Sequence, residues 1–294
     1  MKKVTIFTPT YNRKYLLERV YNSLKSQINK NFIWLIVDDG SNDGTREFIE
    51  KLKLEGIINI TYIYQENSGK MQAHNVGVIN CETDYFVCLD SDDLLTNEAV
   101  EMILNNVDKI TKENCAGIIA YKCISKDKRD LLGSFFNTNY STLSGIYDNG
   151  YIGETTLIFK TEVIKQYLFP KFKNEKFITE VYIYDRIDRK YCYYILPEIL
   201  TIYEYQEYGL TNSIYNLIKN NPMGYMEYWK QKFIFSCEDK KLSDVVKSAI
   251  NYLCFSFNAN IYTIKALGVA QFLVLVVLYP IGFLKYTFLN EREK

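Results

Sequence analysis

The first 95 residues alternate between short apolar runs and longer amphipathic segments. Four apolar runs have the length and the β-branched or aromatic content of buried strands: 4–8, 32–37, 57–64 and 85–89. Three segments with apolar residues at helical spacing separate them, at about 14–26, 45–54 and 71–80. This β-α-β-α-β-α-β order predicts an α/β fold with a doubly wound, mostly parallel sheet flanked by helices.

The rest of the chain continues this pattern less regularly and ends in helices. We expect further strands at 116–125, 191–196 and 200–205, and helices at 97–109, from about 221 and at 243–257. The predicted organisation is a sheet domain over 1–212, with halves 1–97 and 98–212, and a helical C-terminal region over 213–294.

One segment of the C-terminal region, 266–284, contains 19 residues without a formal charge and has a lysine on either side. Its length falls within the roughly 17–25 residues that span a bilayer core. Gln271, Pro280 and Gly282 are also compatible with a buried helix. We expect a membrane-associated helix here, and the pattern leaves open whether it spans the bilayer or lies in the interface.

Composition excludes several classes of protein. Lys+Arg and Asp+Glu both number 35, so the chain has no basic excess with which to bind nucleic acid. The seven cysteines are scattered without C-x-x-C spacing, which indicates reduced thiols in a cytosolic protein rather than disulfides or a zinc site. His74 is the only histidine, which excludes a multi-histidine metal site. The N-terminus enters a strand directly, without an apolar segment of signal-peptide length.

Polar residues follow each of the four predicted parallel strands, at 8–13, 38–43, 65–70 and 90–93. Ligands of such sheets bind beyond the carboxyl ends of the strands, so these segments should form one crevice. Asp90, Asp92 and Asp93 lie within four residues and repel one another unless something neutralises them. A divalent cation shared with substrate phosphates would do so. The alternative is a solvated acidic turn that caps the next helix.

The crevice has features suited to a nucleotide. Asp38 and Asp39 can accept hydrogen bonds from a base or ribose, and Pro9 and Gly40 leave room for a planar ring. Neither G-x-G-x-x-G nor G-x-x-x-x-G-K-[ST] is present, which argues against a dinucleotide cofactor and a P-loop. A cation on the acidic loop, together with Lys70, would hold a diphosphate and make it a good leaving group.

Four ordered motifs resemble the family 2 glycosyltransferases of the GT-A fold: T-P-T-Y-N-R, V-D-D-G-S-N-D-G-T, N-S-G-K with A-H-N-V-G, and L-D-S-D-D. The resemblance covers about residues 3–97 and continues more weakly to about 212. It implies an inverting enzyme that uses a nucleotide-diphosphate sugar, often for bacterial surface polysaccharides. The half over 1–97 would then bind the donor, and the half over 98–212 the acceptor.

The resemblance also implies roles for individual residues. Asp39 would read the base, and the donor site as a whole would consist of Thr8, Pro9, Tyr11, Asp39, Lys70, Asp90 and Ser91. Asp90 and Asp92 match the D-x-D pair, with Asp92 as a ligand of Mn²⁺ or Mg²⁺ and Asp90 as a ribose or metal contact. Asn75 and Gly77 match a structural A-x-N-x-G motif, which makes His74 a packing residue.

Inverting transfer requires a general base that takes the proton of the acceptor hydroxyl. The family places an acidic residue downstream of D-x-D at the start of a helix, and Glu180 in F-I-T-E-V-Y fits that place. Glu154 and Asp185 are alternatives, and Thr179–Glu180 could instead be an ordinary helix cap.

The sequence lacks the Q-x-x-R-W motif of the processive branch of the family. The resemblance implies a metal-dependent hexosyltransferase that uses a UDP-sugar, and the missing motif favours addition of one sugar to a glycan or lipid-linked acceptor, which we expect at the cytoplasmic face of the membrane. Two alternatives are a sugar-phosphate nucleotidyltransferase and a non-catalytic nucleotide- or glycan-binding subunit of a polysaccharide assembly complex.

Overall fold

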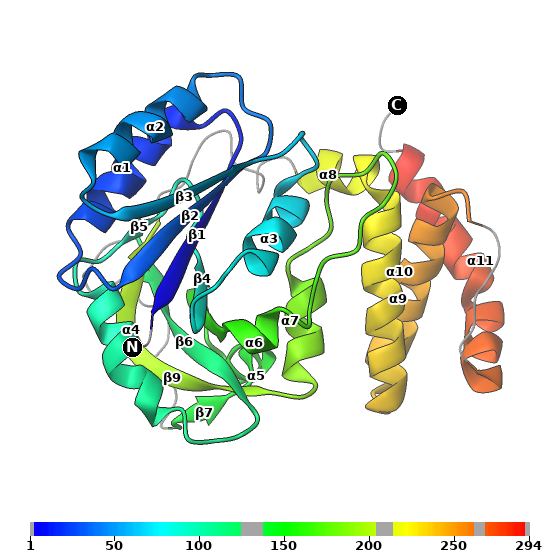
Figure 1. Ribbon diagram of the computed structural model, residues 1–294. Coiled ribbons are helices and arrows are strands. Elements are labelled where there is room, and N and C mark those ends of the chain that lie inside the picture. Colours follow the sequence, from blue (N-terminus) through cyan, green and yellow to red (C-terminus); the bar gives the residue numbers. More distant parts are fainter. Residues whose placement is uncertain (1–2, 125–137, 204–213, 262–267, 292–294) are drawn as a thin grey trace. The chain divides into compact units, whose positions relative to one another are not determined.

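The computed structural model of the protein describes residues 3–124, 138–203, 214–261 and 268–291 (Figure 1). The chain forms two compact units, which we call the sheet unit and the helical unit. The sheet unit comprises Met1–Phe169 and Ile183–Glu207, and the helical unit comprises Pro170–Tyr182 and Tyr208–Lys294. Residues 170–182, which the sequence placed in the sheet domain, thus group with the C-terminal helices.

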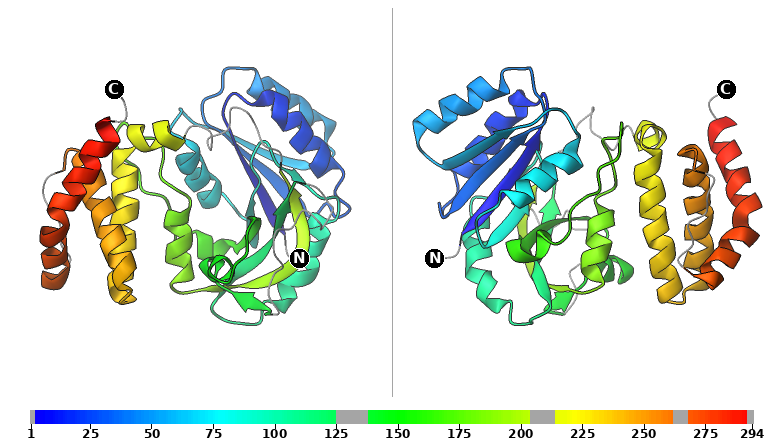
Figure 2. Two further views of the ribbon diagram at one scale, coloured as in Figure 1. Left: turned by 180° about the vertical axis from the view of Figure 1, so that it is seen from behind. Right: turned by 45° about the vertical axis from the view of Figure 1, so that its right-hand side comes forward.

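The first half of the sheet unit has the predicted alternation of strands and helices. Its parallel strands, in the spatial order β3-β2-β1-β4, are β1 (Val4–Thr10), β2 (Phe32–Asp38), β3 (Asn59–Tyr64) and β4 (Tyr85–Cys88). The helices between them are α1 (Lys14–Lys25), α2 (Thr45–Glu55) and α3 (Lys70–Ile79). Helices α1 and α2 lie on one face of the sheet and α3 lies on the other (Figures 1 and 2).

The second half extends the sheet with mostly antiparallel pairs. The added strands are β5 (Leu94–Leu95), β6 (Cys115–Cys123), β7 (Tyr140–Ser141), β8 (Glu154–Lys160) and β9 (Cys192–Ile202). Strand β8 pairs antiparallel with both β4 and β6, and β6 pairs parallel with β9, so within the described residues the sheet has nine strands. Its helical elements are α4 (Ala99–Asn106), a 3₁₀ turn (Val107–Lys109), α5 (Leu143–Asp148), α6 (Thr161–Ile164) and α7 (Val181–Asp188).

One expectation about this half was wrong. The two strands predicted at 191–196 and 200–205 form a single strand, β9, which contains Pro197. The pairing of β6 with β9 is irregular on either side of Tyr121, which pairs with Ile199, so the sheet accommodates the proline at a shift in register. Residues 204 and 205 of the prediction lie outside the described part of the chain.

Alternating side chains of β1 pack on opposite faces of the sheet. Val4 and Ile6 belong to the core that also contains Leu17 of α1 and Ile49 of α2. Phe7 points to the other face and packs against α3, where a Cβ added to Gly77 would lie 2.5 Å from its ring. The small residue at position 77 therefore lets α3 approach the strand that leads into the crevice.

His74, one turn before Gly77, lies in the same layer. It is buried, and its ring packs edge-on against Phe7, Phe86 and Phe169. The neighbouring Asn75 accepts a hydrogen bond from the backbone N–H of Phe169 at 2.9 Å and donates one to its carbonyl at 2.8 Å. Both side chains thus do structural work in α3, as the sequence motif suggested.

Over 214–261 and 268–291 the helical unit has four helices: α8 (Ile214–Asn220), α9 (Pro222–Glu238), α10 (Leu242–Asn258) and α11 (Val269–Glu291). Helix α10 packs against both α9 and α11. Their contact forms a separate apolar core that includes Tyr225, Phe233, Leu253 and Leu275.

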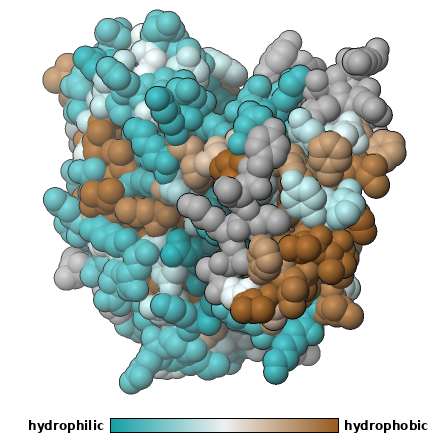
Figure 3. Space-filling model, turned by 90° about the vertical axis from the view of Figure 1, so that its right-hand side faces the viewer, coloured by the Kyte–Doolittle hydropathy of each residue, from teal (hydrophilic) through white to brown (hydrophobic). Residues whose placement is uncertain are grey.

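Helix α11 is long and apolar enough over Val269–Leu289 to cross a bilayer, by length and composition. Only 11% of its most apolar 18-residue stretch is buried, whereas the core helix of a soluble protein would be mostly buried. The exposed apolar residues include Leu273, Val277, Leu284 and Phe288, and Figure 3 looks onto the side of the molecule that carries this helix. Residues 266 and 267 of the predicted segment lie outside the described part of the chain.

We expect Gly77→Ala to lower the free energy of unfolding by about 1–3 kcal/mol, because the added methyl group overpacks α3 against Phe7. Urea denaturation measures the change. Gly268→Ala is the matched control, since its Cβ would meet Gln271 at an ordinary distance of 3.6 Å. Equal stabilities of the two variants would contradict the proposed close approach.

Candidate active site

Two adjacent carboxylates, on the last residue of β2 and on the residue after it, are both buried. Asp38 accepts hydrogen bonds from the backbone N–H of Ser41 at 2.8 Å and from the hydroxyl of Tyr62 at 2.6 Å. It therefore fixes the turn after β2 rather than facing a ligand.

Asp39 connects this turn to the start of α3. Its carboxylate accepts from Gln65 Nε2 at 2.6 Å and from the backbone N–H groups of Ser68 and Gly69 at 2.8 and 2.9 Å. A carboxylate has about four lone-pair directions, so one remains for a ligand. Gly40, at φ +90°, passes close to Asn67, where a Cβ would meet the backbone nitrogen at 2.9 Å. Glycine is therefore required where the two loops meet.

The residues predicted around Asp39 differ in their access to a ligand. Thr8 is fully buried, and its hydroxyl accepts a hydrogen bond from Trp34 Nε1 at 3.0 Å. Pro9 is buried in β1, whereas Tyr11 is 49% exposed in the loop that follows. Of these three residues, Tyr11 has the exposed side chain, and Thr8 and Pro9 are buried.

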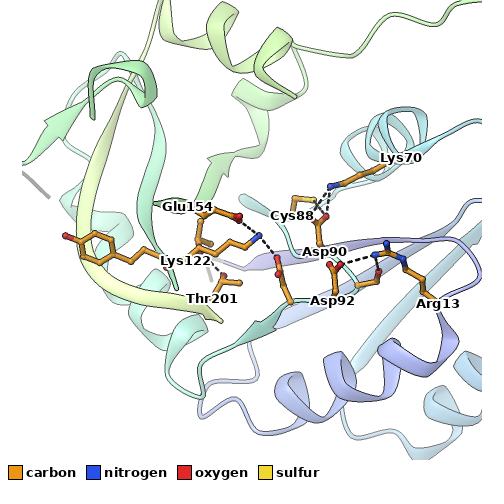
Figure 4. Close-up of polar contacts among 12 residues, drawn as sticks. Arg13, Lys70, Cys88, Asp90, Asp92, Lys122, Glu154 and Thr201 are labelled. Atoms are coloured by element: carbon orange, nitrogen blue, oxygen red, sulfur yellow. Dashed lines mark hydrogen bonds and ion pairs between the residues drawn. The ribbon is translucent and has the colours of Figure 1, made fainter. Parts of the chain in front are cut away.

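The acidic loop after β4 is neutralised by three basic residues from three different elements (Figure 4). Lys70, the first residue of α3, lies 2.9 Å from the carboxylate of Asp90. Arg13, immediately before α1, contacts Asp92 at 3.1 Å and the hydroxyl of Ser91 at 3.3 Å. The structure thus brings the predicted residues Lys70, Asp90, Ser91 and Asp92 together.

The third carboxylate has a different partner. Lys122 of β6 lies 2.7 Å from Asp93 and 2.9 Å from Glu154, at the start of β8. Asp93 is 5% exposed, so its charge depends on this ammonium group. Lys122 therefore links the acidic loop to the second half of the sheet.

Charge and burial shift the pKa values of Asp90 and Asp93 in opposite directions. Burial favours the neutral acid of Asp90, but Lys70 and Lys122 outweigh it and hold the pKa of Asp90 at about 2. Burial raises the pKa of Asp93 to about 7, Lys122 opposes that rise and Asp90 adds to it. Asp90 is therefore an anion at neutral pH, and Asp93 is the carboxyl group of the loop that binds a proton most readily.

The donor atoms of Asp90 and Asp92 fit a hard divalent cation. Mg²⁺-type sites use one or two carboxylates together with substrate phosphates, and both side chains are partly exposed. Among the described residues no group of three or more acidic, histidine or cysteine side chains could hold a metal ion. The protein alone thus offers two ligands, and a diphosphate would have to supply others.

The three candidate bases lie in different surroundings. Glu154 is engaged by Lys122 beside Asp93. Asp185 lies within α7, in the sheet unit. Glu180 immediately precedes α7, at the helix start where it was expected, but it belongs to the helical unit.

Two residues of this site were missed by sequence reasoning. Arg13 is the last residue of T-P-T-Y-N-R, and its position next to a predicted strand end was a usable signal. Lys122 lies 29 residues after Asp93 on a strand that shows no other polar feature, so nothing local pointed to it.

Lys122→Met should lower the free energy of unfolding by about 3–5 kcal/mol at pH 8, because a buried carboxylate loses its cation. Without Lys122 the pKa of Asp93 should rise above about 7. A carboxyl whose folded-state pKa exceeds its unfolded value loses stability as pH rises, so the deficit should be smallest near pH 5 and grow above pH 7. Urea titrations at several pH values measure it.

Lys53→Met is the control, since Lys53 pairs with Glu50 at the surface and its loss should cost about 1 kcal/mol or less. A deficit for Lys122→Met that does not depend on pH would contradict the assigned role of Asp93.

Several glycosyltransferases are similar to this chain. It is 26% identical to the putative teichuronic acid biosynthesis glycosyltransferase TuaG of Bacillus subtilis, over 59% of this chain and 68% of that protein. It is 29% identical to the glycosyltransferase GlyA of Streptococcus pneumoniae, over 56% of this chain. This match spans only 23% of GlyA.

Two solved structures show the fold. S. aureus TarS in complex with UDP has a TM-score of 0.59 at 16% identity, covering 98% of this chain and 90% of that chain. The mannosyltransferase PcManGT of Pyrobaculum calidifontis, in complex with GDP-Man and Mn²⁺, has a TM-score of 0.55 at 15% identity, covering 98% of this chain and 84% of that chain. These similarities confirm the predicted GT-A-type sheet with C-terminal helices.

The family model described as glycosyl transferase family 2 matches residues 5–168, more than half of the 294 residues. The match covers β1 to β4, the acidic loop and Lys122. The resemblance of the four motifs is thereby confirmed, and the chain belongs to glycosyl transferase family 2.

Proposed function

We propose that this protein is a metal-dependent, inverting hexosyltransferase that takes a sugar from a nucleotide-diphosphate donor, a UDP-sugar. The observation that carries the proposal is the acidic loop at the carboxyl end of β4, where Asp90 and Asp92 face the basic groups of Lys70 and Arg13. A site with two carboxylates and two cations can bind both a divalent cation and a diphosphate. Membership of family 2 makes sugar transfer the reaction.

The donor would occupy the strand ends as follows. Asp92 and Asp90 would hold Mn²⁺ or Mg²⁺, and the cation would offset the charge that develops on the departing nucleoside diphosphate. Lys70 and Arg13, whose present partners are these carboxylates, would turn to the phosphate oxygens. TarS in complex with UDP-GlcNAc and PcManGT in complex with GDP-Man and Mn²⁺ support this type of donor.

We assign the general base to Glu180. Its carboxylate would accept the proton of the acceptor hydroxyl as the oxygen attacks the anomeric carbon, with inversion at that carbon. Glu154 suits this role less well, because its carboxylate is already bound by Lys122. Asp185 lies inside α7, whereas Glu180 has the expected position at its start.

The acceptor is a hydroxyl of a glycan or lipid-linked intermediate in bacterial surface polysaccharide synthesis. Two relatives support this class: TuaG, and the poly(ribitol-phosphate) β-N-acetylglucosaminyltransferase TarP of Staphylococcus aureus, 26% identical over 76% of this chain and 74% of that protein. Family membership disfavours a nucleotidyltransferase, and a non-catalytic subunit remains the second candidate.

We further propose that α11 lies on the cytoplasmic surface of the membrane rather than spanning it. Its inner side packs along α10, where a Cβ on Gly282 would meet Leu253 at 2.5 Å and Tyr279 packs edge-on against Phe257. Helix α9, which packs against α10, carries the ion pair of Lys230 and Glu227 in its middle turns. A spanning α11 would draw these charges into the hydrocarbon, whereas an interfacial helix keeps them in water.

We expect Asp92→Ala to weaken donor binding in Mn²⁺ by at least about tenfold, or about 1.4 kcal/mol, and to abolish the difference between Mn²⁺ and EDTA. Calorimetry with UDP-GlcNAc, UDP-glucose and GDP-mannose measures binding, and release of UDP or GDP measures turnover. Asp84→Ala, at the opposite end of β4, is the control. Unchanged metal-dependent binding in Asp92→Ala would refute the metal assignment. Donor binding without turnover on any glycan acceptor would favour the non-catalytic subunit.

The full-length protein should float with vesicles of bacterial lipid extract, and a chain ending at Lys265 should not. Replacing Leu273, Val277 and Leu284 together by serine should reduce the bound fraction at least about tenfold, because apolar area is lost from the exposed face. Leu54→Ser, an exposed leucine of α2, is the control. Self-association in place of vesicle binding would show that a second copy covers this face.

A further inference from the structure

The segment that leads to Glu180 is held by α9. Glu175 accepts hydrogen bonds from the backbone N–H groups of Met223 and Gly224, at 2.8 and 2.9 Å, in the first turn of that helix. Burial raises the pKa of the Glu175 carboxyl, and these two bonds oppose the rise. The partly buried carboxylate therefore depends on α9 for its hydrogen bonds.

Asn221 forms further hydrogen bonds between α9 and the same segment. This residue is the N-cap of α9, yet its side chain makes no capping bond to the helix. Its Oδ1 instead accepts from the backbone N–H groups of Lys176 and Phe177, at 2.9 and 3.0 Å, while its Nδ2 donates to the carbonyl of Leu217. Asn221 thus binds the backbone of the segment, and Glu175 of the segment caps the first turn of α9.

Close packing reinforces these bonds. A Cβ on Gly224 would lie 2.3 Å from the carbonyl oxygen of Phe177, so only glycine permits this approach. Ile178 is buried, with 1% exposed, and the ring of Phe177 lies 6.1 Å from that of Tyr225. The chain two residues before Glu180 is therefore fixed against α9.

The chain beyond Glu180 is held by the same helix. Gln231, a buried residue three turns along α9 from its start, donates from Nε2 to the carbonyl of Tyr182 at 2.9 Å. Glu180 is thus bracketed at 175–178 and at 182 by side chains and backbone of one element. An ordinary helix cap would account for Glu175 alone, not for Asn221 and Gln231.

We infer that Glu175, Asn221 and Gln231 are positioning residues, which together set the place of the Glu180 carboxylate from α9. We call these three residues the α9 clasp. The inference rests on the proposed function, in which Glu180 is the general base. The three residues and Glu180 all belong to the helical unit.

The test compares turnover with donor binding in the full-length protein, using the donor that gives the most UDP or GDP release with water or a glycan acceptor. Asn221→Ala and Glu175→Ala should lower kcat by about 10- to 100-fold, since small displacements of a catalytic group cost about that much. Donor KM and calorimetric Kd should stay within about twofold. Glu175→Gln, which keeps one acceptor oxygen, should lower kcat less than Glu175→Ala.

Asn251→Ala is the matched control. Asn251 is also buried in the helical unit, where its side chain bonds the carbonyl of Lys247 and the ammonium group of Lys285. Its replacement should lower the melting temperature to a similar extent and leave kcat unchanged. An equal loss of kcat in Asn251→Ala would show that the clasp residues act only through the stability of the helical unit, and it would overturn the inference.

Glu180→Gln separates failure of the inference from failure of the proposed function. Full turnover by Glu180→Gln would remove the base assignment itself. Loss of turnover in Glu180→Gln with normal kcat in Asn221→Ala and Glu175→Ala would refute the clasp alone. If either alanine variant fails to fold, Gln231→Met decides, because it removes only the bond to Tyr182 and should show the same loss of kcat at constant donor KM.

Discussion

Three carboxylates within four residues at the end of β4 must be held together against their mutual repulsion. The protein meets this constraint with cations from three separate elements: Arg13 before α1, Lys70 at the start of α3 and Lys122 on β6. Two of these cations, Arg13 and Lys70, have partly exposed side chains. The third is buried between Asp93 and Glu154, so its role is to fix the loop to the sheet.

The same division between ligand contact and support extends through the site. Asp38 and Asp39 accept hydrogen bonds from groups in the loops after β2 and β3, and these loops meet where Gly40 lies against Asn67. Thr8 bonds Trp34 beneath the crevice, and only Tyr11 of its motif is well exposed. Several residues of these sequence motifs therefore have a structural role, since their side chains bond other groups of the protein.

The parallel half of the fold could be predicted because each of its signals is local. Apolar runs of strand length, amphipathic spacing and polar strand ends all lie within short windows, and the acidic loop is visible in L-D-S-D-D. Pairings between distant residues could not be predicted. Lys122 of β6 forms an ion pair with Asp93 of the acidic loop, 29 residues earlier in the chain. Glu175 accepts a hydrogen bond from Met223, 48 residues later. The continuity of β9 through Pro197 could not be predicted either, because it depends on the register with β6, which only the folded sheet defines.

Helix α10 packs against both α9 and α11, so the Glu180 segment and the exposed apolar face of α11 belong to one packed body. If that face rests on lipid, the height of Glu180 above the bilayer is set by the thickness of this body. The reach of the reactive hydroxyl of a lipid-linked acceptor from the bilayer would grow with the number of sugars already attached. The thickness of the helical unit would then favour acceptors of a certain length, independently of any side chain that contacts the acceptor.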